Sequence, residues 1–160
     1  QLENKLLIGL YDSDREGLKQ VKNLKKNLAK GLELVTLKEY SHYQVVEGSK
    51  KHNTHALYLP IPEDRLEEAD FFKNSTTIEY MFSNKTLKDK LNVTMVKRKG
   101  NSFEQIITNE EGKMLSSEKE KIINNINNLS CEDFVYFKPL FETIAEIVGF
   151  ELPNNGKEFE

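Results

Sequence analysis

Two aspartates separated by a single residue, Asp12 and Asp14, are the side chains whose type and spacing most clearly suggest chemistry. They follow the apolar run of residues 6–11 and precede a lysine-rich amphipathic segment. This order predicts a central, buried strand, then an acidic turn, then a helix. Open α/β sheets bind their ligands at the carboxyl ends of strands. Two carboxylates held there predict a site for a hard divalent cation, because such ions prefer oxygen ligands.

The same aspartates also have a simpler use. Either Asp12 or Asp14 can cap the helix by accepting hydrogen bonds from its first backbone amides, and Glu16 favours the positive end of the helix. Capping needs only one acid, whereas here two acids alternate and Arg15 follows. Capping and cation binding therefore both stay open for this pair.

The first half of the chain predicts strands joined by a helix. Residues 5–11, 32–37 and 55–60 are short apolar runs typical of strands. Residues 16–30 carry an apolar stripe at helical spacing and predict a helix. Residues 41–54 are polar and predict a loop. Parallel strands need such crossover connections, so we expect a parallel arrangement for the first strands.

The second half predicts a hairpin followed by a helical pair. Residues 93–97 and 103–108 flank a Gly-Asn turn, as in a β-hairpin. Ser117 stands three residues before a glutamate, the spacing of a capping box, and predicts the start of one helix. Ser130 precedes Asp133 at the same spacing and predicts the start of the last helix.

Composition sets the outer bounds. A chain of 160 residues with 38% hydrophobic residues fits one domain, which we expect over residues 1–150, with a polar tail at 151–160. Cys131 is the only cysteine, which indicates a reducing, cytoplasmic compartment. No apolar run reaches the roughly 20 residues that span a bilayer, so no membrane partner is expected. The net charge of −3 argues against binding of nucleic acid through the overall charge of the chain.

The string from Asp12 to Gly17, Asp-Ser-Asp-Arg-Glu-Gly, resembles the acidic motif of the topoisomerase–primase (Toprim) fold. In that family the motif follows a buried parallel strand, and its aspartates bind catalytic magnesium. The rest of the chain is similar to the C-terminal nuclease part of the overcoming-lysogenization-defect (OLD) family, in residues 58–62, 78–82 and 133–141. The resemblance covers most of residues 5–148. It implies an α/β fold with a Toprim-like, mostly parallel sheet flanked by helices.

The resemblance also implies a site. Asp12, Asp14 and Glu79 are its expected ligands for Mg²⁺ or Mn²⁺, with two ions in the intact protein cleaving DNA phosphodiesters. Lys119 is the lysine expected to stabilise the charged transition state, and Lys113 is the alternative. Glu79 is equally well explained as a surface carboxylate on a short helix. The usual alternative for each of these lysines is a position on a solvent-exposed surface.

One feature departs from the family. Toprim domains carry a glutamate on a strand well before the Asp-x-Asp motif, and here only eleven residues precede Asp12. We therefore expect a domain that lacks its first strand–helix unit, with the strand at residues 6–11 left at an edge. The implied partners are an ATPase domain or subunit, and another copy of the chain through the missing part. On this view the isolated chain cleaves DNA weakly or not at all, and any role in phage defence is a family-level expectation.

Two rival functions remain. A non-catalytic Toprim-like module could contact an ATPase subunit through Phe71, Phe72 and the Phe-rich last helix. A phosphatase of the haloacid dehalogenase type also uses strand–Asp-x-Asp, but it requires Thr or Val where this chain has Glu16. A glutamate after a strand in the sequence upstream of this chain would favour the nuclease over the non-catalytic module.

The other candidate residues fit structural roles better. The three histidines, His42, His52 and His55, lie in or beside a polar stretch without the partner set of a zinc site. A lysine stripe on the first helix and the basic residues 97–99 are typical of solvated surfaces. If the nuclease hypothesis holds, both could contact phosphates without reading sequence.

Overall fold

A four-stranded sheet organises the first half of the protein. The computed structural model describes residues 5–38, 42–72, 75–97 and 103–151. The strand order in the sheet is β1-β5-β4-β3. β1 is parallel to β5, while β4 is antiparallel to both of its neighbours. The strands are β1 (Leu7–Tyr11), β3 (Leu32–Lys38), β4 (His42–Glu47) and β5 (Lys50–Tyr58).

The mixed α/β class is confirmed, but the expected mostly parallel sheet is wrong: the sheet is mostly antiparallel. Most of residues 41–54, expected to be a loop, instead form β4 and the first part of β5. Gly48 adopts a left-handed φ of 56° between these strands and permits their tight connection. A short turn joins antiparallel neighbours, whereas parallel neighbours need a long crossover.

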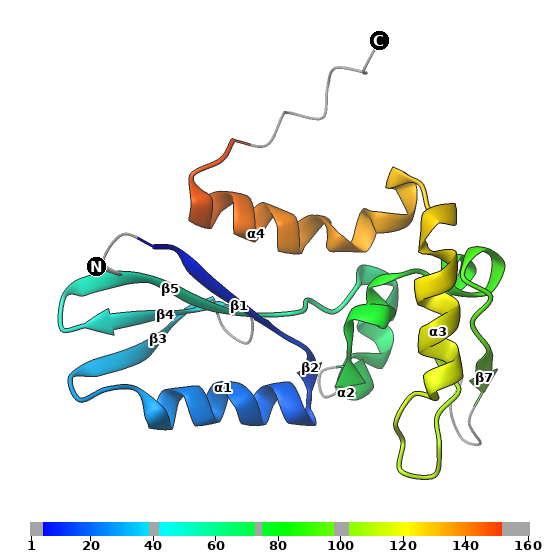
Figure 1. Ribbon diagram of the computed structural model, residues 1–160, viewed down its shortest axis with the longest axis horizontal. Coiled ribbons are helices and arrows are strands. Elements are labelled where there is room, and N and C mark those ends of the chain that lie inside the picture. The colour runs from blue at the N-terminus through cyan, green and yellow to red at the C-terminus, as the bar shows by residue number, and fades with distance from the viewer. Residues whose placement is uncertain (1–4, 39–41, 73–74, 98–102, 152–160) are drawn as a thin grey trace.

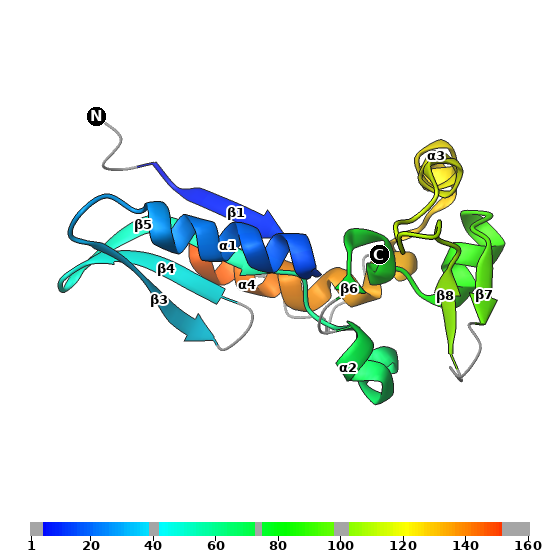
Figure 2. The same cartoon turned by 90° about the horizontal axis from the view of Figure 1, so that it is seen from below.

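Two helices cover opposite faces of the sheet (Figures 1 and 2), as expected for flanking helices. α1 (Arg15–Asn27) buries Val21 against residues of one face, and α4 (Lys138–Val148) lies over the other. Adjacent residues of β5 supply both layers, because side chains alternate along a strand. Leu57 belongs to the core on the α4 side, and Tyr58 to the core on the α1 side.

β1 is an edge strand of the described sheet rather than a central one. Its single neighbour is β5, with Leu7 opposite Thr54 and Tyr11 opposite Tyr58. Leu7 is 62% exposed, so the predicted burial of this strand is wrong. The edge position itself agrees with the expectation of a sheet that ends at this strand.

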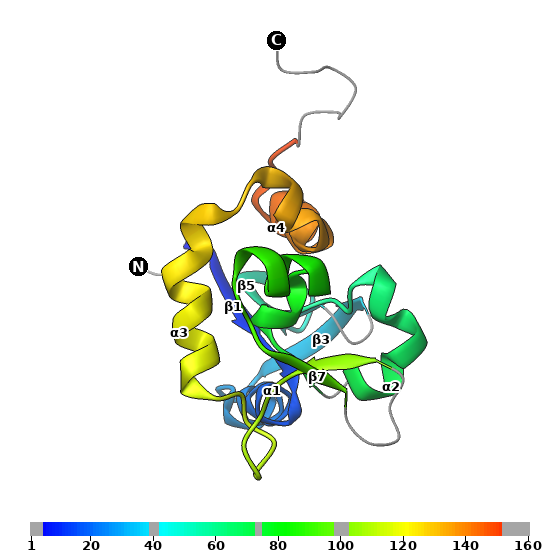
Figure 3. The same ribbon diagram turned by 90° about the vertical axis from the view of Figure 1, so that its right-hand side faces the viewer.

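Short helical segments and hairpins build most of the second half, which extends beyond the end of β5 (Figure 1) and lies in front of the sheet when the molecule is viewed from that end (Figure 3). A short antiparallel pair, β2 (Ser13–Asp14) with β6 (Ser75–Thr76), connects it to the acidic turn. The remaining elements are η1 (Glu63–Glu68), α2 (Ala69–Phe72), η2 (Ile78–Met81), η3 (Thr86–Lys90), β7 (Met95–Lys97), β8 (Glu104–Ile106), α3 (Ser116–Asn125), η4 (Ile126–Asn128) and η5 (Cys131–Phe137).

The predicted hairpin is confirmed by the antiparallel pairing of β7 with β8, although its tip at residues 98–102 lies outside the described residues. The capping box predicted at Ser117 is wrong, because α3 starts at Ser116 and its described N-cap residue, Leu115, makes no side-chain capping bond. The box at Ser130 is confirmed: its backbone amide donates to Asp133 Oδ2 over 2.8 Å. The expected tail falls almost wholly outside the described residues.

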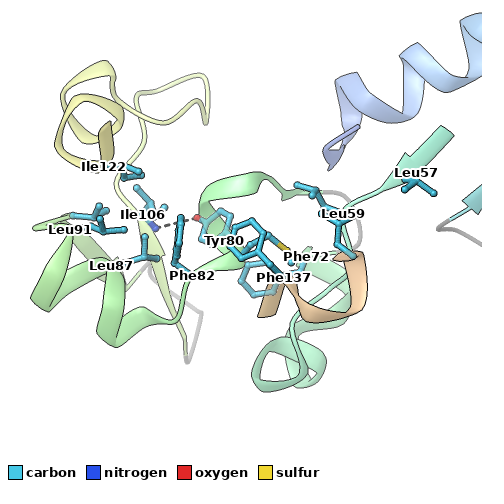
Figure 4. Packing of buried hydrophobic residues seen from close by; sticks show 13 residues of the cluster. Leu57, Leu59, Phe72, Tyr80, Phe82, Leu87, Leu91, Ile106, Ile122 and Phe137 are labelled. Carbon is cyan, nitrogen blue, oxygen red and sulfur yellow. Dashed lines mark hydrogen bonds between the residues drawn. The ribbon is translucent and has the colours of Figure 1, made fainter. Parts of the chain in front are cut away.

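Aromatic and aliphatic side chains join the second half into one core (Figure 4). Phe72 is buried there, so core packing rather than partner contact is its role. The Tyr80 hydroxyl accepts a hydrogen bond from the Ile106 backbone amide over 3.1 Å, which ties η2 to β8 (Figure 4). Among the described residues, no helix is long and apolar enough to cross a membrane.

Candidate metal centre

Asp12 lies at the point where β1 and β5 end. The Leu59 backbone amide donates to the Tyr11 carbonyl over 3.0 Å, so the parallel pairing extends to the residue before Asp12. The buried Ser13 hydroxyl donates to the Leu59 carbonyl over 2.7 Å on the other side of Asp12. These two bonds fix the backbone around Asp12. The predicted position of this aspartate at the carboxyl end of a strand is therefore confirmed.

Asp14 is the N-cap of α1. Its backbone is extended, and its Oδ1 accepts a hydrogen bond from the Gly17 amide over 2.7 Å. The capping interpretation is thus confirmed for Asp14 and not for Asp12. Because the cap uses Oδ1 of a carboxylate with two oxygens, capping does not exhaust the ligand capacity of Asp14.

Gly17 permits the close packing of α1 on the acidic turn. It is buried, and a Cβ built on it would lie 1.9 Å from the Asp12 carbonyl oxygen. Any larger residue would therefore push the helix away from the Asp12 backbone. Glycine lowers the stability of a helix, so its presence at position 17 needs a reason. The close contact with the Asp12 carbonyl provides that reason.

A hydrogen bond joins the acidic turn to the segment that carries Glu79. β2 pairs with β6, Ser13 opposite Thr76, and the chain then enters η2. The Ile78 backbone amide donates to Asp12 Oδ1 over 3.2 Å. Glu79 follows directly in the sequence and therefore lies close to the aspartates.

Lys119 of α3 completes the group. Its Nζ lies 3.9 Å from Glu79 Oε1, an ion pair in which the Glu79 side chain is 14% exposed and the Lys119 side chain 58%. The alternative lysine, Lys113, pairs instead with Glu111 over 3.0 Å, and both of those side chains are well exposed. The geometry thus favours Lys119 over Lys113 as the cation of this site.

The electrostatics of Asp12 reflect this crowding. Partial burial is the main cause that raises the pKa of Asp12 above its ordinary value of 3.8, and the nearby carboxylates of Asp14 and Glu79 raise it further. The Ile78 amide and the Lys119 ammonium act in the opposite direction, because both favour the ionised form. The pKa of Asp12 is therefore affected by Asp14, Glu79 and Lys119, the three other residues expected at the site.

A magnesium ion fits this donor set only in part. Among the described residues, no group of three or more His, Cys, Asp or Glu side chains is arranged to hold a metal ion. Mg²⁺, however, usually keeps several waters and binds through one or two carboxylates. Asp12 with Asp14 meets that requirement, and a nearby cation would relieve the repulsion that raises the pKa of Asp12.

Other candidate residues lie elsewhere. The lysines of α1 are solvent-exposed, and Lys19 pairs with Glu16 over 3.5 Å. His42 and His55 form a contact that the sequence analysis missed, with 2.9 Å between His42 Nε2 and His55 Nδ1. Burial lowers the pKa of both imidazoles. Their strands form a part of the sheet whose pairing the sequence did not predict, so the contact had no visible signal.

Two contributors to the site were also missed. The Ile78 amide is a backbone group and leaves no signature in a sequence. Gly17 does leave one, because a glycine at the third position of a long amphipathic helix is unfavourable unless something needs the space. Comparison of the chain with protein-family models, curated proteins and solved structures found no match. The function has to be argued from the site itself.

Proposed function

We propose that this chain is the metal-binding part of a nuclease that cleaves DNA phosphodiester bonds with Mg²⁺ or Mn²⁺. One observation supports this most strongly. Asp12 and Asp14 of the acidic turn lie near Glu79 of η2 and Lys119 of α3, and the charges of the other three residues all shift the pKa of Asp12. Three carboxylates and one lysine around a strand end suit a cation together with a phosphate.

Each residue has a distinct part in this proposal. Asp12 and Asp14 hold the cation, and Glu79 of η2 adds negative charge beside them and pairs with Lys119. When bound, a cation would supply positive charge that stabilises the charge developing during phosphodiester cleavage. Lys119 presents its ammonium group at the rim, where it can pair with a phosphate oxygen in place of Glu79.

The finer identity is also part of the proposal. The unit β1–acidic turn–α1 supports a Toprim-like domain of the OLD type, acting with an ATPase domain or subunit and with a second copy of the chain. DNA is the substrate, and phage defence is the family-level role. The sheet here has one parallel pair, so the Toprim likeness rests on the acidic unit rather than on the whole sheet.

A non-catalytic interaction module is the second candidate. An apolar groove beside Glu79 and Lys119 favours it, with a volume of about 310 Å³ and walls that include Ile78, Ile123 and Phe134. Ile123 in this groove is 69% exposed. A single exposed isoleucine does not mark a contact surface, whereas a patch of exposed apolar residues does.

The test is plasmid nicking by the protein in its full natural length, with Mg²⁺ or Mn²⁺. Asp12→Asn should lower the rate by more than about 100-fold, because losing a residue that only orients a ligand already costs up to that much. Asp89→Asn, at an exposed position of η3, is the matched control and should retain activity. Full cleavage by Asp12→Asn would contradict the proposal, and absence of cleavage by the unaltered protein would favour the module.

A further inference from the structure

A second pocket lies against the acidic turn; Asp14 belongs both to this pocket and to the proposed metal site, while Arg15, Thr77, Tyr80 and Gln105 are not used by that site. Its volume is about 360 Å³. Asp14 and Arg15 form one wall, the segment around Thr77 and Tyr80 another, and Gln105 of β8 a third. The pocket therefore opens directly beside the proposed point of cleavage.

Buried polar groups in this pocket have no partner within the described structure. Gln105 is only 2% exposed, yet its Nε2 makes no hydrogen bond. Thr77 Oγ1 is also buried and without a hydrogen bond. An unsatisfied buried polar group typically costs about 1–3 kcal/mol, and such a group in a native protein calls for an explanation. A ligand that offers hydrogen-bond acceptors would supply one, since the amide nitrogen of Gln105 is a donor.

The remaining walls suit a flat ring. Phe71, Tyr80, Ile106 and Met114 line the pocket with aromatic and apolar surface. Tyr80 is held by its bond to the Ile106 amide, and the Phe71 ring packs against those of Phe72 and Phe103, with centroids 4.9 and 5.3 Å away. A pocket lined by two aromatic side chains and a buried amide suits an unstacked base, which proteins bind by stacking and by hydrogen bonds to its edge.

We infer that this pocket binds an unstacked nucleobase of the strand that is cleaved at Asp12 and Asp14. Gln105 hydrogen-bonds the edge of the base, and Arg15 at the pocket wall meets the adjoining phosphate. The inference rests on the proposed nuclease function and adds to it a preference for single-stranded or locally melted DNA. A free mononucleotide offers the same chemistry, and the experiment separates the two sources.

The experiment measures binding of a short single-stranded oligonucleotide that contains 2-aminopurine, whose fluorescence is quenched by stacking. EDTA is present, so no metal-dependent step contributes. The unaltered chain should bind and quench the probe. It should bind the matching oligonucleotide with an abasic position, and deoxyadenosine monophosphate, at least about tenfold more weakly. Gln105→Leu should weaken binding about tenfold through loss of the buried amide, and Gln20→Leu, an exposed glutamine of α1, should not.

A second variant guards against misfolding of Gln105→Leu. Met114→Trp, in the loop before α3, should fill the pocket and abolish quenching while the circular-dichroism spectrum stays unchanged. Equal binding of the base-containing and abasic strands would overturn the inference. Tighter binding of the mononucleotide than of the oligonucleotide would also overturn it, because the ligand would then be a free nucleotide and not a base of the cleaved strand. Nicking is measured separately. Quenching without nicking rejects only the nuclease function, and nicking without quenching rejects only the base pocket.

Discussion

The backbone amide of Ile78 donates a hydrogen bond to Asp12 Oδ1 over 3.2 Å, between residues 66 positions apart in the sequence. This bond orients the first carboxylate of the acidic motif. It also brings Glu79, the next residue, close enough to repel that carboxylate. One contact therefore both positions Asp12 and surrounds it with negative charge, an arrangement that a bound cation would stabilise.

The first prediction concerns the ionisation of Asp12. Its pKa should lie above 3.8, mainly because the residue is partly buried. Asp14→Asn and Glu79→Gln should each lower that pKa, because each removes a negative neighbour. Carbon-detected NMR titration of the carboxyl group measures the change, with Glu33→Gln on distant β3 as the control. A pKa of Asp12 that does not move in either site variant would contradict the described crowding.

A stability effect follows from the same shift. Because the folded pKa of Asp12 is raised, ionised Asp12 reduces stability above that pKa, and acidification through it restores the loss. Asp12→Asn keeps an oxygen that can accept the Ile78 amide and removes the charge. We expect a small rise in the Tm of the metal-free protein, measured by calorimetry at neutral pH. A clear fall in Tm would show that the charge of Asp12 stabilises the fold.

Gly17→Ala separates two opposing effects. Helix propensity alone predicts that alanine stabilises α1 by about 1 kcal/mol. The clash of its Cβ with the Asp12 carbonyl, at 1.9 Å, predicts the opposite. We expect destabilisation together with weaker Mn²⁺ binding, measured by denaturant unfolding and by metal titration. Gln20→Ala, on the exposed surface of the same helix, should leave both measurements nearly unchanged.

The two lysines should differ in their effects. Lys119→Met should slow nicking by the full-length protein and raise the pKa of Asp12, because the Lys119 ammonium lowers that pKa. Lys113→Met should change neither, since Lys113 pairs with Glu111. Rates and NMR titrations of the two variants decide the matter. Slower nicking in Lys113→Met but not in Lys119→Met would reverse the assignment.

Asp133 should control acid stability. Hydrogen bonds from Lys90, at 2.6 Å, and from Ser130 hold the pKa of Asp133 well below 3.8. A lowered folded pKa contributes stability above the ordinary value, and that stability is lost as the pH falls below about 3.8. Asp133→Asn should lower the Tm at neutral pH, because it removes the ion pair with Lys90, and should flatten the fall of Tm in acid. An unchanged acid profile would show that this ion pair does not contribute.

The fold was predictable where the pattern was local. The strands at β1 and β3, the helix α1 and the β7–β8 hairpin each follow from apolar spacing or a turn signal. The sheet order was not predictable, because the polar stretch before His55 hides β4 and the start of β5. The exposed and half-buried residues of these strands include lysine and histidine, so the composition of the stretch resembled that of a loop. Without β4, the sequence could not show that β3 and β5 each pair antiparallel with it, or that β1 pairs parallel with β5.

The residues of the candidate site were visible in the sequence, but the contacts that bring them together were not. Asp12 and Asp14 were visible from their spacing after a strand, and Glu79 and Lys119 entered through the resemblance to the OLD family. Their proximity depends on the β2–β6 pair and on the Ile78 amide, which involve backbone atoms that no sequence pattern marks. The pocket at Gln105 was missed for a similar reason, because its walls come from segments joined only in the folded chain.

The most direct test of the central claim is a Mn²⁺ titration of the chain, followed by paramagnetic broadening of its NMR signals. Signals of residues 12–17 and 78–79 should broaden first. Asp12→Asn/Asp14→Asn should abolish that selective broadening while the fold persists, because asparagine caps a helix as well as aspartate does. Glu110→Gln/Glu111→Gln, an exposed acidic pair in the loop before α3, should broaden like the unaltered chain. Identical broadening in the aspartate variant and the unaltered chain would contradict a metal site at Asp12 and Asp14.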